Sequence, residues 1–204
     1  SFSFSHVNLT HRNWTAVGVP NIAAYPIVDP CGLLTPHFDG WSVDAWIVSK
    51  DGRPILVPSR MRDLPQRLEM DPGLVVCTEV ADEEARLHSR IWAECSEQGC
   101  ICRAVYEGEL IEDGFLVVSV RPYNPEGVSF IHEMHVGPDR YDWRIDDKTR
   151  ILFDQPPDRH AFSEYFEGDV SLSLRDPLSR DGVSCRVGMA TGAALFELSA
   201  GRPA

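Results

Sequence analysis

GFLVVSVRPYNPEGVSFIHEMHV, residues 114–136, is the stretch that decides the fold class. In each half, apolar residues alternate with other residues. The apolar positions are Leu116, Val118 and Val120 in the first half, and Val128, Phe130, Met134 and Val136 in the second. A period of two is typical of a half-buried β-strand, because successive side chains point to opposite faces. Between the halves, residues 122–127 contain two prolines and a glycine, which favour a turn. The stretch therefore predicts two strands joined by a stiff turn.

Similar alternation and frequent turn residues mark most of the chain. Lys50-Asp51-Gly52-Arg53 contains an Asp-Gly pair, a strong hairpin signal between two apolar runs. Further strands are expected at 41–48, 54–57, 74–80, 149–153, 170–174 and 183–187. Turn signals recur about every ten residues, as in a sandwich or barrel. The sequence predicts an all-β fold, a large and mainly antiparallel β-sandwich with few or no helices. Residues 1–204 are expected to form one domain, with 1–40 as an extended N-terminal arm and 200–204 as a linker.

Residues 82–94 allow two interpretations. They contain good helix formers, so a helix is the rival prediction. However, the odd positions from Ala85 to Cys95 are mostly apolar and the even positions mostly polar. This alternation, with a partner strand at Ile101–Tyr106, favours a hairpin closed by residues 96–99.

The charge balance narrows the classes of partner. The 204 residues carry 31 acidic and 19 basic side chains, a net charge of -12. Such a field repels phosphate backbones and anionic lipids, so neither nucleic acid nor a membrane is an expected partner. A neutral carbohydrate is not disfavoured. No apolar run reaches the length of a membrane span, and the N-terminus lacks a signal-peptide pattern.

The six cysteines do not require a disulfide framework in a chain of this length. Apolar neighbours predict that Cys77 and Cys185 are buried thiols. Cys95, Cys100 and Cys102 could meet in the predicted hairpin, where a disulfide or a metal clip is geometrically possible. The favoured interpretation is that they are small residues packed in a hairpin core, and their redox state is left open. The expected location is the reducing cytoplasm.

No catalytic residue, metal or cofactor is predicted from the remaining polar residues. His132 and His135 lie one residue short of a zinc-protease spacing, and on a strand they point to opposite sides. His132 falls on the apolar face, which indicates a hydrogen-bonded core histidine. A glycosidase would need two carboxylates at a fixed separation. No pair can be shown to converge among Glu126, Glu133, Asp142 and Glu164.

Trp92 is the single candidate binding residue. It lies among charged residues on the polar face of its predicted strand, where it could stack on a sugar ring or anchor a neighbouring domain. The alternative is that the N-terminal arm covers it. Trp143 and Tyr141 are expected in the core, while Trp41 and Trp46 lie on opposite strand faces.

Three segments resemble a known family: RNWTAVG (12–18), VDPCGLLTPHFDGWSVDAWI (28–47) and VSVRPYNPEGVSFIHEM (118–134). They are similar to the N-terminal region of bacterial proteins related to glycogen debranching enzymes. Those belong to the glycoside hydrolases with a six-hairpin (α/α)6 catalytic barrel. RPYNPEGVSFI is the most specific segment, and the resemblance spans most of residues 10–175.

The resemblance implies a β-supersandwich domain that precedes the catalytic barrel. The general acid and base of such enzymes lie in the barrel, so this chain would be non-catalytic. It would support the barrel and help to shape a glucan-binding cleft. The implied partners are the (α/α)6 catalytic domain of the same native chain and an oligo- or polysaccharide. The alternatives are a free-standing carbohydrate-binding module, which needs a surface row of aromatic residues, and a complete small enzyme.

Overall fold

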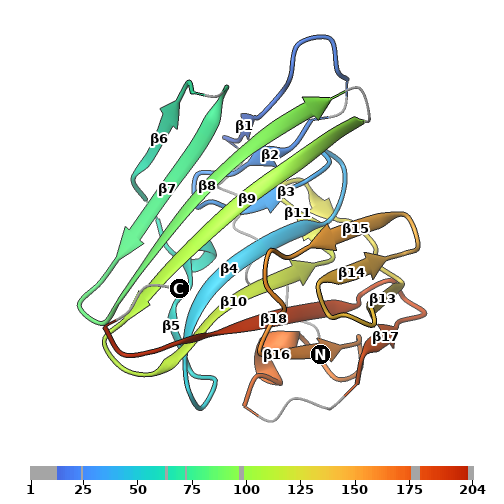
Figure 1. Ribbon diagram of the computed structural model, residues 1–204. Helices are drawn as coiled ribbons and strands as arrows, with labels where there is room; N and C mark the ends of the chain where they lie inside the picture. The colour runs from blue at the N-terminus through green and yellow to red at the C-terminus, as the bar shows by residue number, and fades with distance from the viewer. Residues whose placement is uncertain are drawn as a thin grey trace.

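The chain folds almost entirely into antiparallel β-strands (Figure 1). A computed structural model describes residues 13–23, 25–62, 64–71, 73–96, 99–175 and 180–201. Within these residues the helical elements are two short 3-10 turns, η1 (Pro58–Arg60) and η2 (Val170–Leu172). The predicted all-β, mainly antiparallel fold is confirmed.

The main sheet has eight strands. Its order is β1 (Thr15–Ala16), β2 (Ile27–Val28), β3 (Leu34–Thr35), β4 (Ser42–Ser49), β10 (Gly114–Arg121), β18 (Thr191–Leu198) and β16 (Arg159–Ser163), with β5 (Pro54–Leu56) also paired to β4. β10 lies at the centre, where Val118 pairs with Ala45 on one side and with Ala194 on the other.

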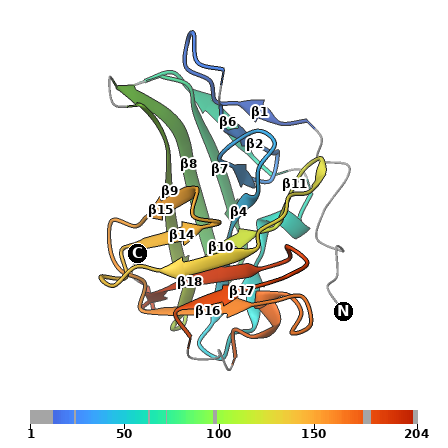
Figure 2. The ribbon, with the colours of Figure 1, turned by 90° about the vertical axis from the view of Figure 1, so that its right-hand side faces the viewer.

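Two four-stranded sheets and a short ribbon complete the fold. The second sheet contains β6 (Gln66–Glu69), β7 (Val75–Ala81), β8 (Ala85–Ser96) and β9 (Gly99–Leu110). The third sheet has the order β15 (Thr149–Leu152), β14 (Asp142–Ile145), β13 (Glu133–Val136) and β17 (Gly182–Ser184). The ribbon pairs β11 (Tyr123–Asn124) with β12 (Gly127–Val128). In Figure 2 the strands of the second sheet run across the direction of β10, β18 and β16.

One hydrophobic core joins the three sheets. Val118 and Phe196 of the main sheet belong to the same cluster of buried side chains as Ile91 of the second sheet and Trp143 of the third. The ring centroid of Trp143 lies 4.9 Å from that of Phe162 on β16. Both smaller sheets therefore pack on the same face of the main sheet, which is a sandwich-like arrangement.

The opposite face of the main sheet is also covered. Trp46, Phe115 and Leu195 form a second buried cluster with Val170 and Leu174, from the segment around η2. All eight residues of β10 are buried as a result. The expectation of a half-buried strand was wrong here, because Phe115, Val117 and Ser119 on the second face are as buried as the apolar residues on the first.

The second half of the stretch 114–136 does not form one strand paired with the first. The turn is confirmed, since β11 and β12 pair around it. Beyond it, Val128 and Phe130 are 48% and 61% exposed, and the chain leaves the main sheet to enter the third sheet as β13. The prediction of a core histidine at His132 was wrong, because this side chain is exposed.

The hairpin predictions are confirmed at two places. Residues 85–96 form strand β8 rather than a helix, and β8 pairs with β9 along its full length. β4 turns into β5 at Gly52, whose φ of 78° is easy only for glycine. The strand predicted at 170–174 was wrong. Its first residues form η2, whose cap Asp169 accepts a hydrogen bond from the Ser171 amide.

The described part of the predicted N-terminal arm supplies β1, β2 and β3 at one edge of the main sheet. Its side chains Val17, Ile27 and Leu34 are buried. Residues 1–12 of that arm, and residues 202–204 of the predicted linker, lie outside the described residues.

Candidate functional site

A row of buried polar residues crosses the second face of the main sheet near the ends of its strands. In the strand register, Ser42 lies opposite Arg121, and Ser163 lies opposite Thr191. These four side chains are at most 1% exposed. Burial of so many polar groups on a central sheet demands partners, so this row is the first place to look for a site.

Arg121, the last residue of β10, is the centre of this group. Its guanidinium forms an ion pair with the Asp169 carboxylate. Its Cζ lies 5.0 Å from the ring centroid of Trp46 and 5.3 Å from that of Tyr123. A desolvated guanidinium between aromatic faces and a carboxylate is well stabilised. The position of Arg121 is therefore fixed from three sides.

Asp44 brings a second buried carboxylate to the same group. It lies on β4, and its Oδ2 accepts a hydrogen bond of 2.8 Å from the Ser59 hydroxyl of η1. Burial raises the pKa of Asp44, while the nearby charge of Arg121 opposes that rise. We call Asp44, Arg121 and Asp169 the ion cluster. It ties β4 and β10 to the segments that cover them.

The ion cluster cannot act on a sugar as it stands. Asp44 and Asp169 are 3% and 4% exposed, and both lie against the covering segments. A glycosidase instead places its two carboxylates on either side of a bond in an open cleft. Among the residues that the structure describes, the Nε atom of Arg121 and the hydroxyl of Tyr123 have no hydrogen-bond partner. Ordered water could satisfy these groups, so the arrangement is that of a structural polar core.

A small cavity lies between the main and second sheets. Asp44, Thr78, Ser89 and Tyr106 are among the residues that line it. Its volume is about 10 Å³, which is room for one water molecule and far too little for a sugar ring.

Asp29 is a third buried carboxylate, in the loop between β2 and β3. Its Oδ1 accepts hydrogen bonds from the amides of Cys31 (2.8 Å) and Leu33 (2.9 Å). Burial raises the pKa of Asp29 to about 7, against the effect of these hydrogen bonds. This carboxyl group shapes the loop rather than facing an open site.

Trp92, the candidate from the sequence, lies on the outer face of the second sheet and is half-buried. Its indole Nε1 donates a hydrogen bond of 2.8 Å to Glu94, which also accepts one of 2.7 Å from Arg103. The register places Ile101 and Val105 diagonally across from it, and both are exposed. On the described part of this face Trp92 is the one Trp, Tyr or Phe, so a row of aromatic residues is not formed there.

Glu133 and Asp142, two of the carboxylates singled out from the sequence, do not form a pair. In the β13–β14 ladder, Glu133 lies beside Asp146 at one end and Asp142 beside Gly137 at the other. Four residue steps separate them, about 13 Å at strand spacing, which exceeds what glycosidase chemistry uses. Asp142 binds Arg150 at 2.7 Å. Glu126 is exposed on the turn between β11 and β12, and Glu164 lies beyond β16.

No group of three metal-ligating side chains occurs among the residues that the structure describes. His132 and His135 do not converge with a third ligand there.

Trp143 is buried as expected, whereas Tyr141 is 43% exposed, so its predicted place in the core was wrong. Trp41 and Trp46 pack in different clusters on opposite sides of the main sheet, as predicted.

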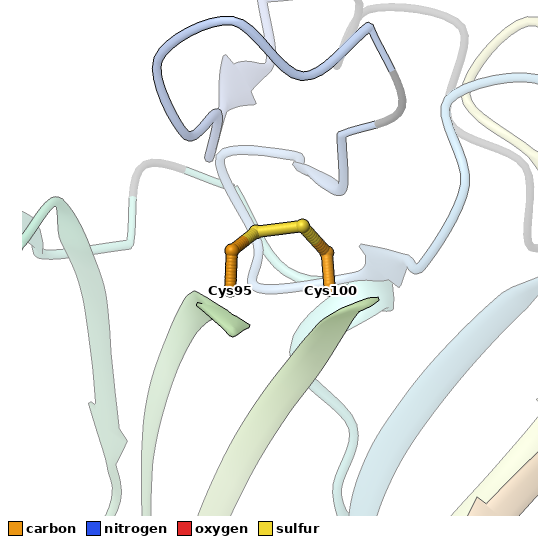
Figure 3. Close-up of a disulfide and its surroundings, with 2 residues drawn as sticks. All are labelled: Cys95 and Cys100. Atoms are coloured by element: carbon orange, nitrogen blue, oxygen red, sulfur yellow. A yellow bond between two sulfur atoms is a disulfide. The ribbon is translucent and has the colours of Figure 1, made fainter. Parts of the chain in front are cut away.

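The cysteines of the β8–β9 hairpin are arranged differently from the favoured prediction. Cys95 and Cys100 form a disulfide at the hairpin tip (Figure 3), and both residues are exposed. The prediction that these two cysteines pack in a hairpin core was therefore wrong. Cys102 is a free, half-buried thiol, and the predicted burial of Cys77 and Cys185 is confirmed.

Sequence reasoning missed the ion cluster. The available signal was Asp44, the one charged residue in the sequence SVDAWIVS. The residues before and after it in this strand are buried. A lone acid at such a position needs a buried ionic or hydrogen-bonding partner, and Arg121 ends the neighbouring strand.

The sequence comparisons do not extend this picture. No model of a known protein family matches the chain, and no curated protein matches it. In the described parts of the chain, no helix is both long and apolar enough to cross a membrane.

Proposed function

We propose that this chain is a non-catalytic β-sandwich domain of a glycoside hydrolase of the glycogen-debranching or glucoamylase-like kind. Its role is to support an (α/α)6 catalytic domain and to help shape the glucan-binding cleft. The proposal rests on the resemblance of residues 10–175 to that family. The layered antiparallel sheets fit such a role, but they are common to many functions.

The observation that carries the non-catalytic part is the burial of the ion cluster. RPYNPEGVSFI, the most specific segment of the resemblance, begins at Arg121, and this side chain is 1% exposed and paired with Asp169. The segment therefore has a structural use that needs no substrate. The cavity lined in part by Asp44 of the ion cluster has room for a single water molecule.

The test is to incubate the purified chain with glycogen and linear malto-oligosaccharides and to measure released reducing ends. We expect no hydrolysis, and none or very weak binding by affinity electrophoresis. Hydrolysis by these residues alone would refute the non-catalytic assignment. Sequencing the native reading frame beside these residues tests the predicted barrel, because it must encode paired helical hairpins.

A carbohydrate-binding module is the second candidate, and Trp92 is the observation that favours it. The half-exposed indole could stack on a sugar ring beside Ile101 and Val105. Retention of the chain on an α-glucan matrix, lost in Trp92→Ala but kept in Tyr141→Ala, would support this function. Equal retention of both variants would remove Trp92 as the binding residue.

A further inference from the structure

The disulfide at the tip of the β8–β9 hairpin is not needed to bring its two strands together. Cys95 lies directly opposite Cys100, and the ladder continues from there to Ala85 and Leu110. Eleven further residue pairs hold the same two strands in register. The bond therefore adds a cross-link where pairing already exists.

The cross-link also closes only a short segment of chain, since the two cysteines are 5 residues apart. The stabilisation that a disulfide gives through chain entropy grows with the length of the loop it closes. Disulfides that hold small folds together join distant segments instead. Stabilisation of the domain is thus a weak explanation for this bond.

Accessibility separates this pair from the other cysteines. Cys95 and Cys100 are exposed at the tip, whereas Cys77 and Cys185 are 0% and 2% exposed. Thiol–disulfide exchange requires a thiolate to reach a sulfur atom, so access decides which disulfide reacts. The exposed tip meets that requirement in the folded protein.

Cys102 shares a strand face with Cys100 but is not suited to attack the disulfide. It is half-buried and lies opposite Ala93, two ladder positions further from the tip than Cys100. Burial raises the pKa of the Cys102 thiol to about 12, so it stays protonated at neutral pH. Since the thiolate is the nucleophile, exchange at the tip depends on an external thiol.

We propose that Cys95–Cys100 is a thiol-exchange site, opened in the folded protein by a dithiol-containing reductase. A thiolate of the reductase attacks one tip sulfur, forming a mixed disulfide and releasing the other cysteine as a thiolate, which takes up a proton. The second thiol of the reductase then attacks the mixed disulfide and releases the remaining cysteine. Two electrons pass to the pair, which ends as two thiols, and the reductase ends as a disulfide. An exposed disulfide of this kind is typical of redox-regulated sites.

The test uses the purified, oxidised chain with thioredoxin, thioredoxin reductase and NADPH in native buffer. Free thiols are alkylated with iodoacetamide and located by peptide mass spectrometry. We expect labelling of Cys95 and Cys100, with Cys77 and Cys185 unlabelled. Tm should fall by no more than about 8 °C, because a short closed loop contributes less stability than a long one. Cys102→Ser should leave the labelling unchanged.

The matched control is the double variant Cys95→Ser/Cys100→Ser, in which NADPH consumption should fall to the background rate. Three results would overturn the proposal. One is that the pair becomes labelled only in denaturant. Another is that labelling disappears in Cys102→Ser, and the third is that peptide mapping of the oxidised chain finds no Cys95–Cys100 link. The labelling of the wild-type chain decides the matter even if the double variant fails to fold.

Discussion

Arg121 and Asp169 are 48 residues apart in the sequence and form an ion pair beneath the main sheet, with side chains 1% and 5% exposed. The pair joins the end of the central strand to the segment that covers it. Because Asp44 lies at the same guanidinium, one cation serves two buried carboxylates. The stability of the whole sheet is therefore expected to depend on Arg121.

Arg121→Met should destabilise the domain by about 3–5 kcal/mol, because it leaves two buried carboxylates without their cation. Guanidinium chloride denaturation followed by tryptophan fluorescence measures the loss. Arg103→Met is the control, since Arg103 pairs with Glu94 at the surface and its removal should change stability little. Similar losses in the two variants would contradict a special role for the buried cation.

Asp29 should make stability fall as the pH rises. Its carboxyl has a pKa of about 7 in the folded chain against 3.8 as the ordinary value, so the folded state holds the proton more tightly between these values. The favourable contribution is complete below about pH 4 and is lost as the pH rises through 7. Asp29→Asn should remove this dependence, a difference of up to about 4 kcal/mol between pH 4 and pH 8. Thermal unfolding of both proteins across this range measures it. A constant difference in stability between them would show that Asp29 does not titrate in this way.

Gly114→Ala should be poorly tolerated at the start of β10. An added Cβ would lie 2.3 Å from the Val48 carbonyl oxygen and 2.5 Å from Leu110 Cδ2. Overpacking of this kind costs about 1–3 kcal/mol, and here one of the obstacles is backbone. Gly73→Ala is the matched variant, because its Cβ would meet nothing within 4 Å. Urea denaturation of the two variants should separate them clearly, and equal midpoints would be incompatible with the close approach at Gly114.

Trp143→Ala should weaken the attachment of the third sheet to the main sheet. The indole is fully buried and packs against Phe162 and Phe153. Loss of a buried tryptophan costs about 3–5 kcal/mol. Tyr141→Ala, on the exposed side chain two residues earlier, should have little effect on Tm. If the two variants have the same Tm, the attachment of the third sheet does not depend on the contact of Trp143 with Phe162 and Phe153.

The strand assignments that succeeded depended on local patterns. From Ala85 to Cys95 the alternation predicted the structure correctly and the helix-forming residues did not, because strand β8 has one face on the core and one in water. The Asp51-Gly52 turn likewise needed only local geometry. The alternation at residues 170–174 gave a wrong prediction, because there the Asp169 side chain accepts a hydrogen bond from the Ser171 amide of η2.

The remaining features depend on contacts between distant segments. Nothing within 114–136 shows that the segment around η2 covers β10, and so the burial of both faces could not be predicted. The ion cluster combines Asp44, Arg121 and Asp169 from three regions of the chain, so only the lone acid in β4 hinted at it. The disulfide was within the open alternatives, but the exposure of the hairpin tip follows from how far β8 and β9 extend.

The central position of β10 has a consequence for how the molecule assembles. Its two neighbours, β4 and β18, lie on either side of it in the sequence, and each pairing closes a loop of many tens of residues. Such a topology has a high contact order. The entropy of closing these loops is lost before the strand pairing can stabilise the fold. On the ribosome β18 emerges after the other strands of the main sheet and fills the place between β10 and β16, so a nascent chain is expected to acquire its native fold late.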